Sequence, residues 1–311
     1  MQTVERAHAE DGIAPGAVAV VFRTHFFDAE VTRRLRKLRD GIARHCAGTD
    51  IHLLVETGTQ VPPEFETIAT RFSYRDYAVG FPKASRHDVY PGNHHLPALY
   101  FAEIFPRYGH YWFIEYDVVY TGNWGKFLNE FRTDRSHLLA AHIREFDDLP
   151  GWYWAGSLES GEEDFAGLTP IAAFLPIYRA SALALDTLRD ACARGWSGHV
   201  ETLMPTAIHA AGLTLSDMGG TGKWTPPDRR QRHYLAPEKV SLWETVSTLR
   251  YRPNIIRPLL PRILHHPCKT RRETGLYDNW KNYRRAYRNA PSDMSRFFLT
   301  VLSQFLPLPR R

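Results

Sequence analysis

Residues 111–117 read Tyr-Trp-Phe-Ile-Glu-Tyr-Asp, an apolar run that ends in two carboxylates. The first four residues have the length and composition of a buried strand. Glu115 and Asp117 stand two positions apart, so on an extended strand their side chains share one face. Ligands of open α/β sheets gather at the carboxyl ends of the strands. Two hard oxygen ligands there suit Mg²⁺ or Mn²⁺ holding a diphosphate, although such a pair is also typical of the solvated start of a loop.

The chain before this strand predicts a doubly wound, mostly parallel α/β sheet. Residues 16–22 are a continuous apolar run of the kind that is buried on both faces of a parallel sheet. Residues 28–42 then place charged and apolar side chains at helical spacing, and residues 51–55 are a second strand. We expect a third, weaker strand at 74–79 and a helix at 94–105. This β-α-β order favours parallel pairing.

The chain after the acid pair continues with strands and helices in turn. The expected strands are 137–142, 171–178 and 213–218, and the expected helices are 124–131, 181–193 and 199–211. Residues 144–167 break the pattern with tryptophans, acids and glycines at no regular spacing. Such a segment is either a functional loop with an aromatic platform for a sugar ring, or a surface loop pinned by buried tryptophans.

Composition limits the partners of the chain. Its 311 residues are 43% hydrophobic and 23% charged, which excludes wholesale disorder. The net charge of +5 favours a phosphorylated ligand or an anionic membrane surface, and no zinc-finger or RNA-binding pattern supports nucleic acid. Three separated cysteines suit a reducing compartment. Without a signal-peptide core or a run of about 18 apolar residues, the expected location is cytoplasmic.

Several common enzyme motifs are absent. Residues 219–223 read Gly-Gly-Thr-Gly-Lys, but Trp224 stands where a phosphate loop needs Ser or Thr. The first strand is not followed by GxGxxG, which argues against a dinucleotide-dependent dehydrogenase. GxSxG and HExxH are missing, so a serine hydrolase and a zinc protease are not expected.

The remaining features together resemble the GT-A fold glycosyltransferases. The features are a first β-α unit without a glycine fingerprint, a central strand ending in Glu115-Tyr116-Asp117, and a strand–helix leading to Glu201. In that family an Asp-x-Asp-type motif binds the divalent cation of a nucleotide sugar. The resemblance covers roughly residues 16–269 by the order of elements. It implies an enzyme that moves a sugar from a nucleotide-diphosphate donor to a hydroxyl of a cell-surface polysaccharide or glycolipid, with Mn²⁺ or Mg²⁺.

The resemblance also assigns metal ligands. Asp117 is then a direct ligand, and Glu115, which replaces the usual first Asp, contacts the metal, its water or the ribose. Many members add a late histidine, here His265 or His266, and we place His266 in the set. A histidine ligand favours Mn²⁺ over Mg²⁺. The alternative for both histidines is an ordinary surface position. Lys269 is positioned to neutralise the leaving diphosphate.

The same resemblance places donor and acceptor groups. Arg23 and Thr24, at the end of the first strand, receive the nucleotide together with Glu115 and Tyr116. Glu201 is the expected acceptor-side base, with Asp147 or Asp148 as substitutes. A first-turn glutamate is also common simply because the helix dipole favours it.

The sequence predicts a catalytic domain over residues 1–250 and a C-terminal helical extension over 251–311 that completes the site. The apolar residues of 294–306 recur at helical spacing, which suits packing on the core or on the inner face of a membrane. Two other functions stay open. One is a metal-dependent nucleotidyltransferase, although residues 23–27 lack its glycine-rich loop, and the other is a non-catalytic nucleotide-sugar-binding module.

Overall fold

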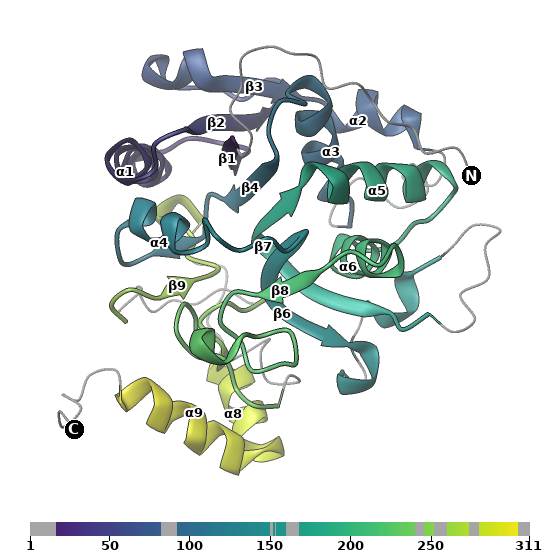
Figure 1. Cartoon of the computed structure of the whole chain (residues 1–311). Helices are drawn as coiled ribbons and strands as arrows, with labels where there is room; N and C mark the ends of the chain where they lie inside the picture. Colours follow the sequence, from purple (N-terminus) through teal and green to yellow (C-terminus); the bar gives the residue numbers. More distant parts are fainter. Residues whose placement is uncertain are drawn as a thin grey trace.

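The computed structural model describes residues 17–81, 92–149, 152, 154–159, 168–239, 246–251, 260–273 and 280–303. Within these residues, seven strands form one sheet in the order β3-β2-β1-β4-β7-β6-β8 (Figure 1). The strands are β1 (Val18–Thr24), β2 (Thr49–Glu56), β3 (Ala69–Phe72), β4 (His110–Glu115), β6 (Leu138–Glu145), β7 (Ile171–Ser181) and β8 (Leu215–Asp217).

One strand runs against the others. β1 pairs in parallel with β2 and β4, β2 with β3, and β6 with β8. β7 is antiparallel to both β4 and β6. All eleven residues of β7 are buried, because helices or other strands cover both of its faces. The prediction of a doubly wound, mostly parallel α/β sheet is confirmed.

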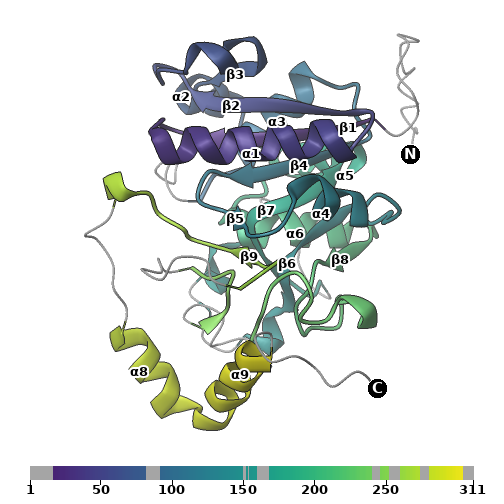
Figure 2. The same cartoon turned by 90° about the vertical axis from the view of Figure 1, so that its left-hand side faces the viewer.

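Helices cover both faces of the sheet, as Figures 1 and 2 show. The longer helices of the two layers are α1 (Ala29–His45), α3 (His95–Ile104), α4 (Trp124–Glu130), α5 (Ala182–Ala193) and α6 (Val200–Ala210). Alternate residues of β4 divide between the layers. Tyr111 and Phe113 join the apolar cluster under α3, α5 and α6, whereas Trp112 and Ile114 join the cluster under α1 and α4.

Local signals fix the ends of these helices. Asp28 caps α1 by accepting hydrogen bonds from the backbone N–H groups of Glu30 and Val31, at 2.9 and 2.8 Å. α1 and α4 approach so closely at Gly41 and Gly125 that a Cβ on Gly125 would lie 2.0 Å from the Gly41 carbonyl oxygen. This contact sets α4, which follows the acid pair in the chain, directly against α1.

The prediction of a strand at 74–79 is wrong. The strand lies earlier, as β3, and Tyr74–Tyr77 form the short helix α2, followed by a 3₁₀ turn at Ala78–Gly80. Ser73 starts this helix because its side chain accepts a hydrogen bond from the backbone N–H of Asp76 at 3.3 Å. The aromatic residues that suggested a strand pack instead against Phe72 and Tyr100.

The C-terminal part returns to the carboxyl edge of the sheet. β5 (Val119–Tyr120) pairs in antiparallel fashion with β9 (Leu264–His265). We call residues 260–273 the return segment. It is followed by α8 (Trp280–Asn289) and α9 (Pro291–Ser303), which lie below the sheet in Figures 1 and 2. Among the described helices, none has both the length and the apolar character needed to cross a bilayer.

The remaining elements are single 3₁₀ turns. They lie at Pro63–Ile68, Phe146–Asp148, Ala155–Ser157, Pro227–Arg229 and Arg271–Glu273. The last of these ends the return segment beside Tyr116 and Lys269.

Candidate active site

The two acids lie at the carboxyl edge of the sheet. Glu115 is the last residue of β4 and stands in register with Arg23 of β1. The chain then turns, and the Tyr116 N–H donates to the Arg23 carbonyl at 2.9 Å. Asp117 enters the interior and is only 2% exposed, whereas the Glu115 side chain keeps 22% exposure. The end of β4 therefore presents one buried and one accessible carboxylate.

The return segment brings His266 to these acids. The His266 backbone N–H donates to Thr248 at 2.9 Å, and its carbonyl accepts from Arg250 at 3.0 Å. Its ring Nδ1 lies 2.9 Å from the Arg250 carbonyl oxygen, which only accepts, so Nδ1 is the donor. The other nitrogen, Nε2, lies 3.5 Å from Asp117 Oδ1 and 3.7 Å from Glu115 Oε2. The ligand atoms of the three side chains all lie within 4.8 Å of one another.

We call Glu115, Asp117 and His266 the acid–histidine cluster, and its chemistry fits a divalent cation. Asp117 Oδ1 is buried and accepts no hydrogen bond from the residues that the structure describes. A buried carboxylate oxygen without a partner is costly. A cation among two carboxylates and one imidazole removes this penalty. A donor set of two oxygens and one nitrogen suits Mn²⁺ better than Mg²⁺.

Glu115 is held by a second group of residues on its other oxygen. Arg23 contacts Glu115 Oε1 at 2.6 Å, and His94 Nδ1 lies 3.3 Å from the same oxygen. Burial alone would raise the pKa of Glu115. Contacts with His266 and His94 and the charge of Arg23 outweigh burial and hold that pKa well below its usual value. Glu115 is therefore ionised, and its Oε2 is turned toward the cluster.

Lys269 adds a positive charge beside the cluster. Its Nζ lies 2.7 Å from Asp117 Oδ2 and 2.9 Å from the Tyr116 hydroxyl. The Tyr116 hydroxyl in turn donates to Glu273 Oε1 at 2.6 Å. Burial lowers the pKa of Lys269, but the charge of Asp117 outweighs burial and raises that pKa above its usual value. With 30% of its side chain exposed, Lys269 is a permanent cation that faces both Asp117 and solvent.

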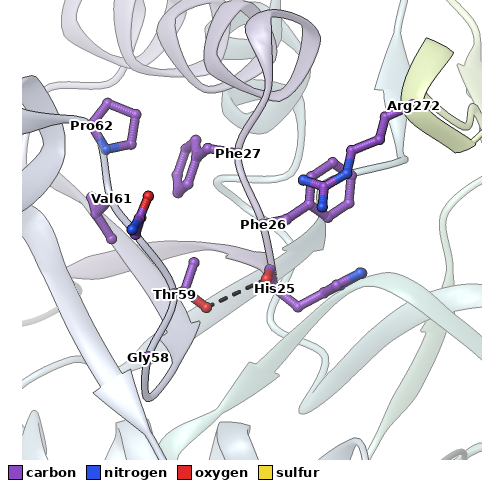
Figure 3. Close-up of a pocket in the computed structure, with 9 residues that line it drawn as sticks. His25, Phe26, Phe27, Gly58, Thr59, Val61, Pro62 and Arg272 are labelled. Carbon is purple, nitrogen blue, oxygen red and sulfur yellow. Dashed lines mark hydrogen bonds between the residues drawn. The ribbon is translucent and has the colours of Figure 1, made fainter.

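A cavity of about 450 Å³ opens beside this group (Figure 3). It lies where β1 and β2 end, and its lining comprises His25, Phe26, Phe27, Gly58, Thr59, Gln60, Val61, Pro62 and Arg272. The Phe26 ring packs edge-on against Tyr116 with centroids 5.1 Å apart, and the Arg272 guanidinium lies 5.1 Å from the same Phe26 ring. Tyr116 therefore connects the cavity to the acid–histidine cluster.

Arg23 and Thr24 do not line this cavity. Arg23 binds Glu115, and Thr24 is 6% exposed and donates its hydroxyl hydrogen to the Phe26 carbonyl at 2.7 Å. The three residues that directly follow β1, His25, Phe26 and Phe27, line the cavity instead. The end of β1, which was predicted to receive the nucleotide, therefore lies close to the cavity, but the side chains of Arg23 and Thr24 are not part of its lining.

Glu201 lies in the first turn of α6, deep in the same half of the molecule. It is 6% exposed, and its backbone N–H donates to Nδ1 of His199, the residue that caps the helix. The His199 ring is stacked on Trp154 with centroids 4.1 Å apart. Burial, followed by the charge of His94, lowers the pKa of His199 to about 3. The segment that carries His94 therefore contacts both Glu115 and the start of α6, since the Val200 N–H donates to the Gly92 carbonyl at 2.9 Å.

Asp148 is placed differently. It is exposed in the 3₁₀ turn after β6, and within the described residues no hydrogen bond or ion pair joins it to the acid–histidine cluster. Asp147 in the same turn is also exposed. Of the two histidines left open by the sequence, His265 lies in β9 with its Nδ1 on the Ile263 carbonyl, and His266 faces the acids.

Three further residues of the site could not be predicted from any local sequence pattern. His94, Glu273 and Arg272 contact Glu115, Tyr116 and Phe26, respectively, from distant parts of the chain. No spacing rule links them to the acid pair. The pairing of β5 with β9, together with the Lys269–Asp117 ion pair, sets the return segment at this edge.

Three comparisons show which known proteins this chain is similar to. A family model described as "Protein of unknown function (DUF3405)" matches residues 49–135. A comparison with curated protein sequences found no significant match. One similar solved structure is a glycosyltransferase involved in the glycosylation of the major capsid of PBCV-1, with 12% identity and a TM-score of 0.29 over 58% of this chain and 68% of that one.

A second similar structure is a putative glucose-1-phosphate thymidylyltransferase from Bacillus anthracis. It has 12% identity and a TM-score of 0.38 over 66% of this chain and 88% of that one. Similarity at this level carries no functional argument. The α/β class of this protein rests on its own sheet, and its function has to be argued from the acid–histidine cluster.

Proposed function

We propose that this protein is a metal-dependent glycosyltransferase that moves a sugar from a nucleotide-diphosphate donor to a hydroxyl acceptor. One observation carries the proposal. A buried carboxylate oxygen of Asp117, without a hydrogen-bond donor, faces an imidazole nitrogen and a second carboxylate at the carboxyl edge of an α/β sheet. Mn²⁺ or Mg²⁺ at such a position supplies charge for the two phosphates of the donor.

The surrounding residues suit a nucleoside diphosphate. The cavity beside Tyr116 offers the Phe26 and Phe27 rings to a base and Arg272 as a cation at its mouth. Lys269 contacts both Asp117 and the Tyr116 hydroxyl, so in the proposal its ammonium group neutralises negative charge that grows on the leaving phosphate. Arg23 keeps Glu115 ionised and fixed in place.

In the proposal, the acceptor binds on the side of Glu115 that lies opposite the nucleotide cavity. Trp154 stacked on His199 offers an apolar ring face of the kind on which sugars pack. In the proposal, the Glu201 carboxylate takes the proton of the acceptor hydroxyl when that oxygen attacks the sugar carbon. The acceptor is then a glycan or a glycolipid, as the sequence resemblance implies.

The direct test is a thermal-shift titration with UDP and GDP in the presence of Mn²⁺, and again with EDTA. A ligand that binds only the folded protein raises its melting temperature, so we expect a Mn²⁺-dependent rise with one of the two nucleotides. Asp117→Asn should remove the rise. Asp148→Asn, an exposed acid at the same edge, should retain it. If neither nucleotide binds at millimolar concentration, the donor site is wrongly assigned.

A second assay separates the remaining functions. Slow hydrolysis of a nucleotide sugar in the presence of Mn²⁺ is expected of a transferase without its acceptor and not of a binding module. Release of the nucleoside diphosphate fits a glycosyltransferase, whereas formation of pyrophosphate from a nucleoside triphosphate and a sugar phosphate would identify a nucleotidyltransferase.

A further inference from the structure

The last helix of the described chain presents apolar side chains to solvent. Phe298, Leu299 and Leu302 of α9 are 45%, 64% and 54% exposed. Their spacing places them side by side on one face, since residues three and four apart are neighbours on a helix. We call them the α9 stripe. A neighbouring face of α9, with Met294 and Phe297, packs in one apolar cluster with Leu260 and Ile263. The helix is thus anchored along one side and open along the other.

The helix before it is basic on its exposed side. Arg284, Arg285 and Arg288 of α8 are exposed, and Arg284 and Arg288 stand one turn apart on the same face. Asp293 is the only acidic residue between positions 280 and 303. It is 5% exposed and lies 3.6 Å from Lys239, so it does not offset the arginine charge at the surface. The helical pair therefore combines exposed arginines with an exposed apolar stripe.

We propose that α8 and α9 dock this protein on an anionic lipid surface. Apolar side chains beside basic ones are the combination by which interfacial helices enter the headgroup region, where each basic residue also gains from the negative surface potential. A second copy of the chain is a poorer occupant. Three side chains fall well short of the about 800 Å² that each partner buries in a stable dimer.

The position of the pair suits this role. α8 and α9 lie apart from the helices that cover the sheet, at the bottom of both Figure 1 and Figure 2. They follow the return segment, which carries His266 and Lys269. The lipid contact does not depend on the proposed glycosyl transfer, and it can be tested independently.

The test is co-sedimentation of the full chain with two kinds of vesicle, phosphatidylcholine alone and phosphatidylcholine mixed with phosphatidylglycerol. We expect binding to the mixed vesicles and little to the neutral ones. The triple variant Phe298→Ser, Leu299→Ser, Leu302→Ser should weaken binding by about tenfold or more, because binding scales with buried apolar area. The matched control is Val79→Ser with Leu183→Ser, which changes side chains that are 83% and 55% exposed elsewhere.

Three results would overturn the proposal. They are equal binding of wild type to both vesicle types, unchanged binding of the triple variant, and a dimer in light scattering that the triple variant converts to a monomer. Circular dichroism and the melting temperature of the triple variant should match the wild type, since only exposed side chains change. A loss of vesicle binding together with an unchanged Mn²⁺–nucleotide thermal shift separates lipid docking from the proposed function.

A charge variant completes the design. Arg284→Gln with Arg288→Gln should lower binding to the mixed vesicles and reduce its sensitivity to salt, because high salt shortens the Debye length to about 3 Å at 1 M. Arg33→Gln with Arg44→Gln, on the exposed side of α1, is the matched control and should bind as wild type. Equal losses of vesicle binding in the two double variants would show that net charge alone drives binding, and would contradict a localised docking surface.

Discussion

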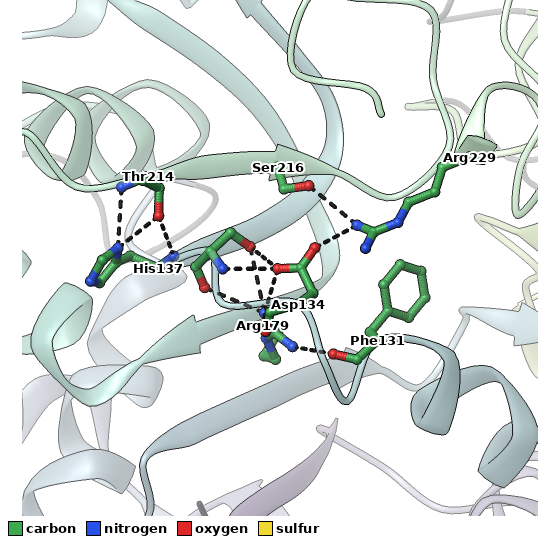
Figure 4. A network of polar contacts seen from close by, with 8 residues as sticks. Phe131, Asp134, His137, Arg179, Thr214, Ser216 and Arg229 are labelled. Atoms are coloured by element: carbon green, nitrogen blue, oxygen red, sulfur yellow. Dashed lines mark hydrogen bonds and ion pairs between the residues drawn. The ribbon is translucent and has the colours of Figure 1, made fainter. Parts of the chain in front are cut away.

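Two buried aspartates lie at opposite edges of the sheet and have opposite surroundings. At the amino-terminal edge, Asp134 accepts hydrogen bonds from Ser136 and from two arginines, Arg179 and Arg229 (Figure 4). At the carboxyl edge, Asp117 has one oxygen on Lys269 and the other without a hydrogen bond. Both side chains are less than a tenth exposed. A buried acid with all its hydrogen bonds made holds the fold together, whereas Asp117 needs a further partner that the described part of the chain does not supply.

The pKa of Asp134 fits its structural role. Burial would raise it, but hydrogen bonds from Ser136 and Arg229 and the charge of Arg179 outweigh burial and lower the pKa to about 2. Asp134 also joins elements that are distant in sequence, since Arg179 lies on β7 and Arg229 follows β8. Its two arginines lie against the Trp112 and Phe131 rings. This network therefore stabilises the edge away from the proposed chemistry.

The largest expected effect is on activity. Asp117→Asn should lower donor turnover by about a thousandfold, because removing one carboxylate from a cation site forfeits about 4 kcal/mol of charge stabilisation. The free energy of unfolding should fall by only about 1 kcal/mol, because Lys269, which loses its ion pair with Oδ2, keeps 30% of its side chain exposed and can be hydrated. Steady-state donor hydrolysis and urea unfolding measure the two quantities. Retained turnover would remove Asp117 from the mechanism.

At the amino-terminal edge, a substitution of Asp134 is expected to change stability rather than nucleotide binding. Asp134→Asn leaves the buried Arg179 and the partly buried Arg229 without their carboxylate and should lower the free energy of unfolding by about 3 kcal/mol. Nucleotide affinity per folded molecule should remain that of the wild type. Urea unfolding followed by a Mn²⁺–nucleotide titration of the folded fraction checks both. A loss of affinity with unchanged stability would reverse the assignment of the two aspartates.

Acid should destabilise the molecule through buried neutral histidines. Burial lowers the pKa of His142 to about 3. Because this folded pKa is below the unfolded value of about 6.5, His142 contributes fully above pH 6.5 and its contribution is lost as the pH falls toward 3. By pH 5 the loss from this residue is about 2 kcal/mol.

The measurement is urea unfolding at pH 7 and pH 5 for wild type and His142→Asn. Asparagine suits the backbone φ of 50° at this position. The variant should be less stable at pH 7, yet lose less stability on acidification than the wild type. An identical loss in the two proteins would show that His142 is not a source of the pH dependence.

The smallest expected effect concerns the cation itself. His266→Gln should weaken Mn²⁺ binding by about tenfold or more, since even partners one shell further out change metal affinity by that factor. The neighbouring His265 is the matched control for charge, although His265→Gln also disturbs the β5–β9 pairing. Electron paramagnetic resonance of free Mn²⁺ gives the affinity directly. An unchanged affinity in His266→Gln would restrict the site to the two acids.

Much of the sheet follows from simple patterns in the sequence. The apolar runs that predict β1, β2 and β4 work because strands buried on both faces need no polar side chain. β7 was predicted as a strand but not as the reversed one, since an apolar run carries no direction. At 74–79 aromatic residues suggested a strand, and a Ser73 cap with local ring packing produced a helix instead.

The candidate site was predictable only in part. Two acids at i and i+2 after a strand are a local signal, so Glu115 and Asp117 were found. The family resemblance predicted His266 and Lys269. The choice between His265 and His266 depends on which of the two side chains faces the acids as the chain leaves β9, and no local sequence pattern determines this. His94 and Glu273 arrive by tertiary packing alone. The residues that remained hidden are those whose partners lie far away along the chain.

The return segment has a consequence for how the molecule matures. Tyr116 and Lys269 touch although 153 positions separate them, and the whole seven-stranded sheet is encoded before residue 218. A nascent polypeptide can therefore assemble its scaffold while the third ligand is still unmade. Full affinity for the cation would then appear only after the return segment has been synthesised. A chain truncated before His266 would keep the strands of the sheet but lack the third ligand.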